Sequence, residues 1–140
     1  MARIKIELPD IFSFQAEIAV RITDLNYGGH VGNDTYLSII HEARLQFLDH
    51  FGFSEMDIEG VGTIMSDAIL LYKGQLYYGS TVLVKMAVTE LSKKRFELTY
   101  LILDKQSQKE AARARTGMVF FDYKENKIAS MPESFRKIFE

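Results

Sequence analysis

Hydrophobic residues recur along this chain at the two periods that distinguish strands from helices. From Phe14 to Ile22 they alternate strictly with other residues, which predicts a half-buried strand. Four later strand-like segments are separated by turn residues: Ile64 to Tyr72, Thr81 to Thr89, Phe96 to Leu103 and Ala112 to Phe121. The short loops between neighbouring strands predict antiparallel pairing. A weaker alternation within residues 4–8 predicts a short extra strand or an arm before the first strand.

Hydrophobic residues that recur every three or four positions predict one long helix after the first strand. Its main apolar positions are Tyr36, Ile39, Ile40, Ala43, Phe47 and Phe51, and Leu37, Leu45 and Leu48 widen the stripe. Such a helix needs cover from other structure around most of its circumference. Asn33 or Asp34 is the expected N-cap and Gly52 the expected stop. A short helix from Glu133 to Phe139 follows, with Pro132 at its start.

This element order predicts an α+β fold in which a five-stranded antiparallel sheet wraps around the long central helix. The segment from Ile64 to Tyr72 is apolar on both faces. We therefore expect it to be covered by something outside the monomer, and a dimer is the simplest explanation. With 140 residues and no shift in composition, residues 1–140 are expected to form a single domain.

Composition and charge exclude several classes of function. The chain has 17 basic and 19 acidic residues, which argues against nucleic acid as the main partner. It has no cysteine, which excludes disulfides, thiolate catalysis and cysteine-based zinc sites. His30, His41 and His50 lack a ligand-like spacing, so we expect no metal. No signal-type segment or membrane-length apolar run is present, so we expect a cytoplasmic protein without membrane insertion.

Candidate chemistry lies where a glycine-rich loop leads into the long helix. Backbone N–H groups at a helix N-terminus can hold a carboxylate, a phosphate or a developing oxyanion. An ordinary capped turn before a core helix would account for the same residues.

The residues of this loop resemble a known family. Asp24 to Asn33 reads DLNYGGHVGN and is similar to the signature turn of hotdog-fold acyl-CoA thioesterases of the 4-hydroxybenzoyl-CoA thioesterase type. Further matches are Tyr36-Leu37, Glu42-Ala43-Arg44, Tyr78-Gly79-Ser80, Ser92 to Phe96 and Met131-Pro132-Glu133. The resemblance implies a homodimer or homotetramer that hydrolyses an acyl-CoA or related acyl thioester. It implies no cofactor beyond the coenzyme A of the substrate.

One departure from the family pattern affects the chemistry. The usual catalytic aspartate is replaced by Asn26, which has neither an anion nor useful basicity. Glu42 on the helix is the first candidate replacement as base or nucleophile, although it could equally belong to a solvated stripe. Asp34 at the helix start is the second. Asp24 is expected to point away from Asn26 or to support the turn.

The resemblance also assigns the remaining roles. His30 would orient water, polarise the thioester carbonyl or brace the loop, and the backbone N–H near Asn33 would hold the oxyanion. Lys93, Lys94 and Arg95 are the candidates for binding the coenzyme phosphates, and Arg113 and Arg115 are second choices.

Two other functions fit the same residues. One is a protein that binds an acyl thioester without efficient turnover, an alternative motivated by Asn26. The other is a hydratase or dehydratase that uses His30 with Glu42 or Asp34.

Overall fold

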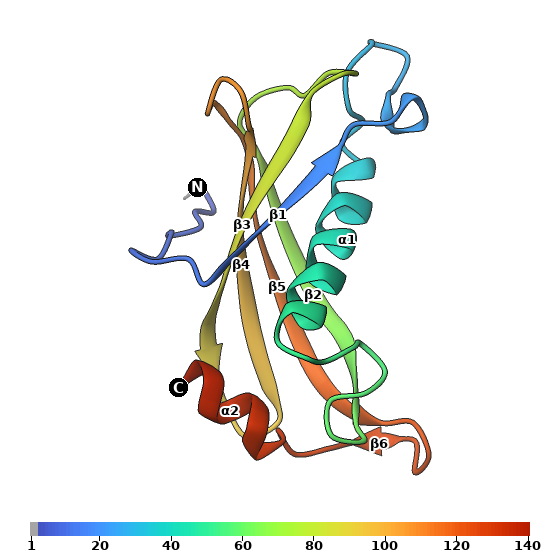
Figure 1. The fold of residues 1–140 in the computed structure, drawn as a ribbon, viewed down its shortest axis with the longest axis vertical. Coiled ribbons are helices and arrows are strands. Elements are labelled where there is room, and N and C mark those ends of the chain that lie inside the picture. The colour runs from blue at the N-terminus through green and yellow to red at the C-terminus, as the bar shows by residue number, and fades with distance from the viewer. Residues whose placement is uncertain (1–2) are drawn as a thin grey trace.

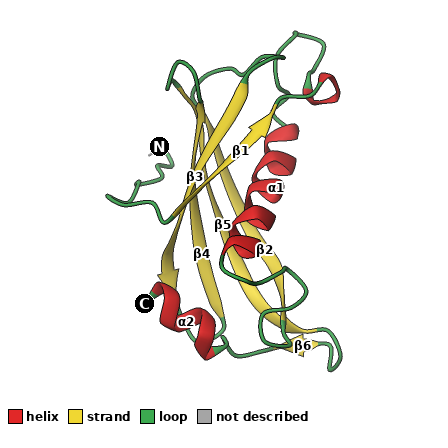
Figure 2. Cartoon of the chain, viewed as in Figure 1, coloured by secondary structure: helices red, strands yellow, loops and turns green. Residues whose placement is uncertain are grey.

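The computed structural model describes residues 3–140, and its sheet curves along one long helix (Figures 1 and 2). The strands are β1 (Phe14–Ala19), β2 (Gly62–Tyr72), β3 (Thr81–Leu91), β4 (Arg95–Asp104), β5 (Glu110–Asp122) and β6 (Lys127–Ile128). The helices are the 3-10 helix η1 (Ile22–Asp24), α1 (Thr35–His50) and α2 (Glu133–Phe139). The predicted α+β class is confirmed.

All strand pairs are antiparallel, in the order β1-β3-β4-β5-β2, and β6 pairs with β5 beside this path. The five main strands are those that the hydrophobic pattern predicts. β6 has only two residues, which is too short for a periodic signal. The order leaves β1 and β2 at the edges of the sheet, so each of these two strands has one side whose backbone groups pair with no other strand.

The chain leaves the first strand earlier than predicted. β1 ends at Ala19, because the backbone N–H and guanidinium of Arg21 donate to the carboxylate of Asp24 and turn the chain into η1. Ile22 is therefore 67% exposed instead of continuing the buried face. Before β1, residues 3–13 form an arm without strand pairing, and Ile6 is buried there while its carbonyl accepts a hydrogen bond from Arg113. The arm lies on the side of the sheet away from α1 (Figure 1).

The two ends of α1 terminate in different ways. Gly52 adopts a positive φ of 86° just after the helix, which confirms it as the stop. At the other end Asp34 occupies the N-cap position, but its backbone is helical and its side chain makes no cap hydrogen bond. Asp34 is therefore confirmed as the N-cap residue, although its side chain does not cap the helix. The N-terminal amides of α1 are left without side-chain acceptors.

The core lies between α1 and the concave face of the sheet, and α2 closes one end of it. Phe47 of α1 and Phe96 and Phe120 of the sheet are fully buried. Phe135 of α2 contacts Phe96 with ring centroids 4.6 Å apart and Phe120 at 5.3 Å. Burial of aromatic side chains of this size contributes a large part of the stability of a small domain.

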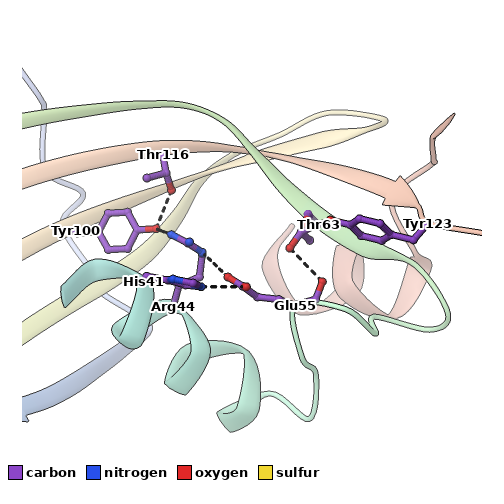
Figure 3. Close-up of polar contacts among 7 residues, drawn as sticks. All are labelled: His41, Arg44, Glu55, Thr63, Tyr100, Thr116 and Tyr123. Carbon is purple, nitrogen blue, oxygen red and sulfur yellow. Dashed lines mark hydrogen bonds and ion pairs between the residues drawn. The ribbon is translucent and has the colours of Figure 1, made fainter. Parts of the chain in front are cut away.

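One polar network crosses this apolar core (Figure 3). Arg44 of α1 is 5% exposed and donates to Glu55 in the α1–β2 loop, at 3.1 Å, and to the Tyr100 hydroxyl, at 3.2 Å. That hydroxyl also hydrogen bonds to Thr116, at 2.7 Å, and burial raises the pKa of Tyr100. His41 reaches the other oxygen of Glu55 from the surface, at 3.1 Å. The network ties α1, its following loop and two strands together.

The edge strand β2 is exposed along its first half in a single chain. Its first half, residues 64–68, is exposed, and Ile64 and Met65 keep 38% and 40% of their surface. This exposure in a single chain is compatible with the expectation that part of the strand is covered by something outside the monomer, which stays a prediction. Its register shifts between Met65 and Asp67, where a β-bulge interrupts pairing with β5.

Candidate active site

Backbone hydrogen bonds hold the loop between η1 and α1 in place, independently of its functional side chains. Gly32 donates to the carbonyl of Asp24, at 3.1 Å, and Val31 donates to the carbonyl of Leu76, at 2.8 Å. Burial alone would raise the pKa of Asp24, but hydrogen bonds and charge from Arg21 outweigh it, and the pKa is lowered. Asp24 is 4% exposed and ionised, which confirms that it supports the turn.

Asn26 uses its two side-chain groups differently. Its Oδ1 accepts a hydrogen bond from the backbone N–H of Gly28, at 2.8 Å, and this forms a local turn. The Nδ2 group has two N–H bonds to donate, no hydrogen bond engages it within residues 3–140, and Asn26 lines the cavity of the candidate site. The asparagine is therefore placed to donate to an oxygen atom rather than to accept a proton.

His30 faces Asn26 across Gly28. A Cβ atom added at Gly28 would lie 3.2 Å from the Oδ1 of Asn26 and 3.2 Å from the Nε2 of His30. The Nδ1 of His30 lies 3.2 Å from the carbonyl oxygen of Val31. Because a carbonyl only accepts, Nδ1 carries the proton of this contact, and the neutral ring has a free lone pair on Nε2. His30 can therefore act as a proton acceptor at this site.

The start of α1 adds hydrogen-bond donors. Thr35 donates its N–H to Gly32, at 2.9 Å, whereas within residues 3–140 the N–H groups of Asn33 and Asp34 have no hydrogen-bond partner. The Tyr72 hydroxyl donates to the carbonyl of Asn33, at 2.8 Å, and fixes this peptide against β2. Free amides at the positive end of a helix are suited to stabilise an oxyanion.

These groups share a cavity of about 450 Å³. It is lined by Asn26, Tyr27, His30, Val31, Asn33, Tyr36, Tyr72, Gly74 and Gln75. Tyr36 is buried, and burial raises its pKa to about 12, so the phenol stays neutral. The rings of Tyr36 and Tyr72 contact edge to face at 5.3 Å. The sequence pattern gives no sign of the role of Tyr36, because it reads as an ordinary core position of α1.

Asp34 lies beside this cavity. Its Oδ1 would be only 2.6 Å from a Cβ atom added at Gly32, so the carboxylate folds back over the loop. Burial raises the pKa of Tyr72, and the charge of Asp34 raises it further. The carboxylate is therefore close enough to influence groups that line the site.

Glu42 is not brought to this cavity. It is exposed and lines a different groove, of about 540 Å³, between α1 and β1, together with Arg21 and Ser38. Its carboxylate accepts a hydrogen bond from Gln46, at 2.7 Å. Within one chain the structure separates Glu42 from Asn26 and His30. Its predicted role as base or nucleophile stays a prediction that would need a second chain.

The predicted phosphate-binding residues also lie elsewhere. Lys93, Lys94 and Arg95 are at the β3–β4 turn, beside α2 and at the opposite end of α1 from Asn26 (Figure 1). The carbonyl of Lys93 accepts a hydrogen bond from Met131, which holds the turn there. Arg95 points to two carboxylates, Asp67 at 3.6 Å and Glu97 at 3.5 Å. The second choices are paired as well, Arg113 with Glu110 at 3.0 Å and Arg115 with Glu97 at 3.8 Å.

Two kinds of site find no support in the described residues. Among residues 3–140, histidine and acidic side chains form no cluster that could hold a metal ion. None of the helices described there has the length and apolar character needed to cross a membrane.

Comparison with known proteins adds independent information. Residues 20–139 match the model of the Thioesterase-like superfamily. A curated relative, the 1,4-dihydroxy-2-naphthoyl-CoA hydrolase of Synechocystis, is 28% identical over 127 residues, 89% of this chain and 92% of the relative. The crystal structure of a 1,4-dihydroxy-2-naphthoyl-CoA thioesterase from Synechocystis matches with a TM-score of 0.80 and 26% identity, over 89% of this chain and 93% of that one.

A second solved structure supports the fold alone. The DHNA-CoA thioesterase of Staphylococcus aureus matches with a TM-score of 0.80 and 23% identity, over 89% of each chain. These likenesses confirm the predicted arrangement of an antiparallel sheet wrapped around a central helix.

Proposed function

The chain belongs to the thioesterase-like superfamily, and from this membership we propose that it hydrolyses an acyl-CoA, or a related acyl thioester, to a free acid and a thiol. The curated relative acts, by its name, on an aromatic acyl-CoA. The observation that carries the proposal is that Asn33, whose backbone amide is free, lines the same cavity as Asn26 and His30. Oxyanion donors, a proton acceptor and an open cavity are what thioester hydrolysis requires.

In the proposed reaction, His30 activates water. Its Nε2 accepts a proton as the water oxygen attacks the thioester carbon, and the carbonyl oxygen becomes an oxyanion held by the amides at the start of α1. When the carbon–sulfur bond breaks, the protonated ring returns this proton to the leaving thiolate. The Nδ2 of Asn26 donates to the carbonyl oxygen. No cofactor beyond the coenzyme A of the substrate takes part.

The cavity favours a planar acyl group. Tyr27, Tyr36 and Tyr72 supply aromatic surface next to the proposed reaction centre. Aromatic pairs gain additional stabilisation from edge-to-face and offset stacking. We therefore propose an aromatic acyl thioester as the preferred substrate.

The direct test is the release of thiol from short-chain, long-chain and aromatic acyl-CoAs, with the products identified. Hydrolysis with multiple turnover, fastest for aromatic acyl groups, is the expected result. Saturable binding without thiol release would identify a binding protein instead. A changed double bond with the thioester intact would identify a hydratase or dehydratase.

The variant Asn26→Asp tests whether Asn26 itself takes part in catalysis or whether the site has lost a catalytic aspartate. The new carboxylate can still accept the hydrogen bond from Gly28, so the turn is kept, but the Nδ2 donor is lost. Loss of one donor to an oxyanion lowers kcat by about 100-fold in well-studied cases, and we expect at least about a tenfold fall here. Steady-state hydrolysis of the best acyl-CoA measures this change. A rise in kcat would show that the site lacks only its carboxylate.

The exposed edge of β2 supports a homodimer, and we propose that two copies pair through this strand. Ile64, Met65 and Ala68 leave apolar surface along an unpaired strand edge, and such edges are usually covered in native assemblies. A tetramer of two such dimers is compatible with the same contact. Action in the cytoplasm stays a prediction.

The dimer is tested by placing a charge on this edge. Met65→Lys is expected to convert dimers to monomers, because pairing would desolvate the ammonium group. Light scattering after size-exclusion chromatography gives the mass. Ile11→Lys, at an 81% exposed position of the arm, is the matched control and should leave the dimer intact. Dimers that persist in Met65→Lys would point to another interface.

A further inference from the structure

The hydroxyl of Tyr36 is a polar group that the fold buries without giving it a hydrogen-bond partner. The side chain is 2% exposed, and within residues 3–140 no backbone or side-chain group forms a hydrogen bond with its oxygen. Tyr100 is also fully buried, yet its hydroxyl is hydrogen bonded to both Arg44 and Thr116 (Figure 3). A buried hydroxyl without a partner costs stability, so each such group in a native structure calls for an explanation.

The Tyr36 oxygen faces the cavity of the candidate site and is not sealed in the core. Tyr36 lines this cavity of about 450 Å³ together with Asn26, His30 and Asn33. Within residues 3–140, the Oγ of Ser134 is the one side-chain polar atom that is both sealed from solvent and unpaired. The unpaired oxygen of Tyr36 therefore keeps contact with the cavity, and a ligand bound there can reach it.

The geometry of α1 directs the Tyr36 side chain toward the oxyanion donors. Side chains of an α-helix lean toward its N-terminus, so Tyr36 lies over the first turn of α1, beside the free amides of Asn33 and Asp34. Its ring contacts the ring of Tyr72 at 5.3 Å, and the Tyr72 hydroxyl is 2.8 Å from the carbonyl oxygen of Asn33. These contacts hold the Tyr36 ring close to the peptide at the start of the helix.

We propose that Tyr36 is a further catalytic residue, whose hydroxyl donates a hydrogen bond to the thioester carbonyl oxygen and to the oxyanion that forms from it. This inference rests on the proposed hydrolysis of an acyl thioester. It adds a side-chain donor to the backbone amide of Asn33 and the Nδ2 group of Asn26. A donor that is already in place stabilises the developing charge without reorganisation.

The phenol acts only as a hydrogen-bond donor in this role. Burial raises the pKa of Tyr36 to about 12, so the hydroxyl keeps its proton while the oxyanion forms and collapses. His30 stays the proton acceptor, and no covalent bond of Tyr36 is made or broken. In the free protein, solvent can take the hydrogen bond that the substrate oxygen takes on binding.

The first experiment tests whether the hydroxyl has a structural role. Tyr36→Phe keeps the ring and its contact with Tyr72 and removes only the oxygen. Because no hydrogen bond within the chain is lost, the urea midpoint should equal that of the wild type or rise. Tyr100→Phe is the matched control, and its midpoint should fall because two core hydrogen bonds are lost. An equal fall in both variants would overturn the proposal.

The second experiment measures hydrolysis of benzoyl-CoA, whose ring carries no polar substituent. Tyr36→Phe should lower kcat about tenfold or more and keep KM within about twofold, because the donor acts mainly on the oxyanion. Tyr78→Phe removes a hydroxyl from a 63% exposed side chain outside the cavity and should change neither constant. An unchanged kcat in Tyr36→Phe would overturn the proposal. So would a fall for 4-hydroxybenzoyl-CoA alone, because the hydroxyl would then bind a ring substituent.

The third experiment does not depend on turnover. Its probes are the ketone analogue of benzoyl-CoA, in which a methylene group replaces the sulfur, and S-benzyl-CoA, which has no carbonyl oxygen. By calorimetry the wild type should bind the ketone at least about threefold more tightly, and Tyr36→Phe should lose this preference. If the preference depends on Tyr36 but no thioester is hydrolysed, the proposed activity fails while the hydrogen bond from Tyr36 stands. If Tyr36→Phe and the wild type show the same preference, the role of Tyr36 fails whatever the activity.

Discussion

His30→Ala should lower kcat for thioester hydrolysis by about 100-fold or more, the usual contribution of a general base. The reason is the orientation of its ring, since Nδ1–H donates a hydrogen bond to the Val31 carbonyl and the lone pair of Nε2 stays free near Asn26. The methyl side chain of alanine cannot accept a proton from water, so only the oxyanion donors would still contribute to catalysis. Thiol release at saturating acyl-CoA measures the loss, and circular dichroism shows whether the variant stays folded.

Two carboxylate variants decide between His30 and the other candidates. Glu42→Gln is the matched control, and its kcat should be unchanged because Glu42 lies in the groove between α1 and β1. Asp34→Asn removes the carboxylate beside the cavity and should change kcat less than His30→Ala does. Loss of activity in Glu42→Gln with His30→Ala still active would contradict the assignment. It would indicate that a helix from a second chain supplies the base.

The largest effect on stability is expected for Arg44→Ala. Arg44 is buried but its partner Glu55 is only partly buried, so loss of the pair is expected to cost about 2 kcal/mol or more. Here the change would remove the guanidinium from Glu55 and one donor from the buried Tyr100 hydroxyl. The free energy of unfolding, measured by urea denaturation, should fall by this amount.

His41→Ala is the control for the same network. His41 also contacts Glu55, but its side chain is 51% exposed, so its removal should cost less than about 1 kcal/mol. Similar losses in His41→Ala and Arg44→Ala would mean that burial of the network does not determine its strength. Arg44→Met would then show how much of the loss comes from the packing of the side-chain stem.

Much of the fold could be predicted because each main element has its own hydrophobic period. The five strands and two helices follow from alternation and from three- and four-residue spacing. The errors lie where side-chain contacts override the pattern. Ile22 continues the alternation of β1, yet the bonds between Arg21 and Asp24 turn the chain before it. Likewise, the sequence of residues 64–68 does not show by itself that β2 lies at an edge.

The candidate site could be predicted only as far as it is local in sequence. Asn26, His30 and Asn33 lie in one loop, and the structure places all three at one cavity. The sequence does not show which side of α1 Glu42 occupies, or at which end of the sheet Lys93 lies. That information depends on strand order and on the rotation of the helix. Tyr72 joins the site for the same reason, since β2 ends beside the start of α1.

The local turn at Asn26 has a consequence for the history of this protein. The turn requires only an oxygen acceptor at position 26 for the N–H of Gly28, and asparagine and aspartate supply it equally well. Exchange of the two residues is therefore expected to leave the fold intact while it changes the charge at the proposed catalytic centre. A lineage could cross between the two chemistries through stable intermediates, without compensating changes elsewhere in the chain. At position 26, a substitution can therefore change the activity without affecting the ability of the chain to fold.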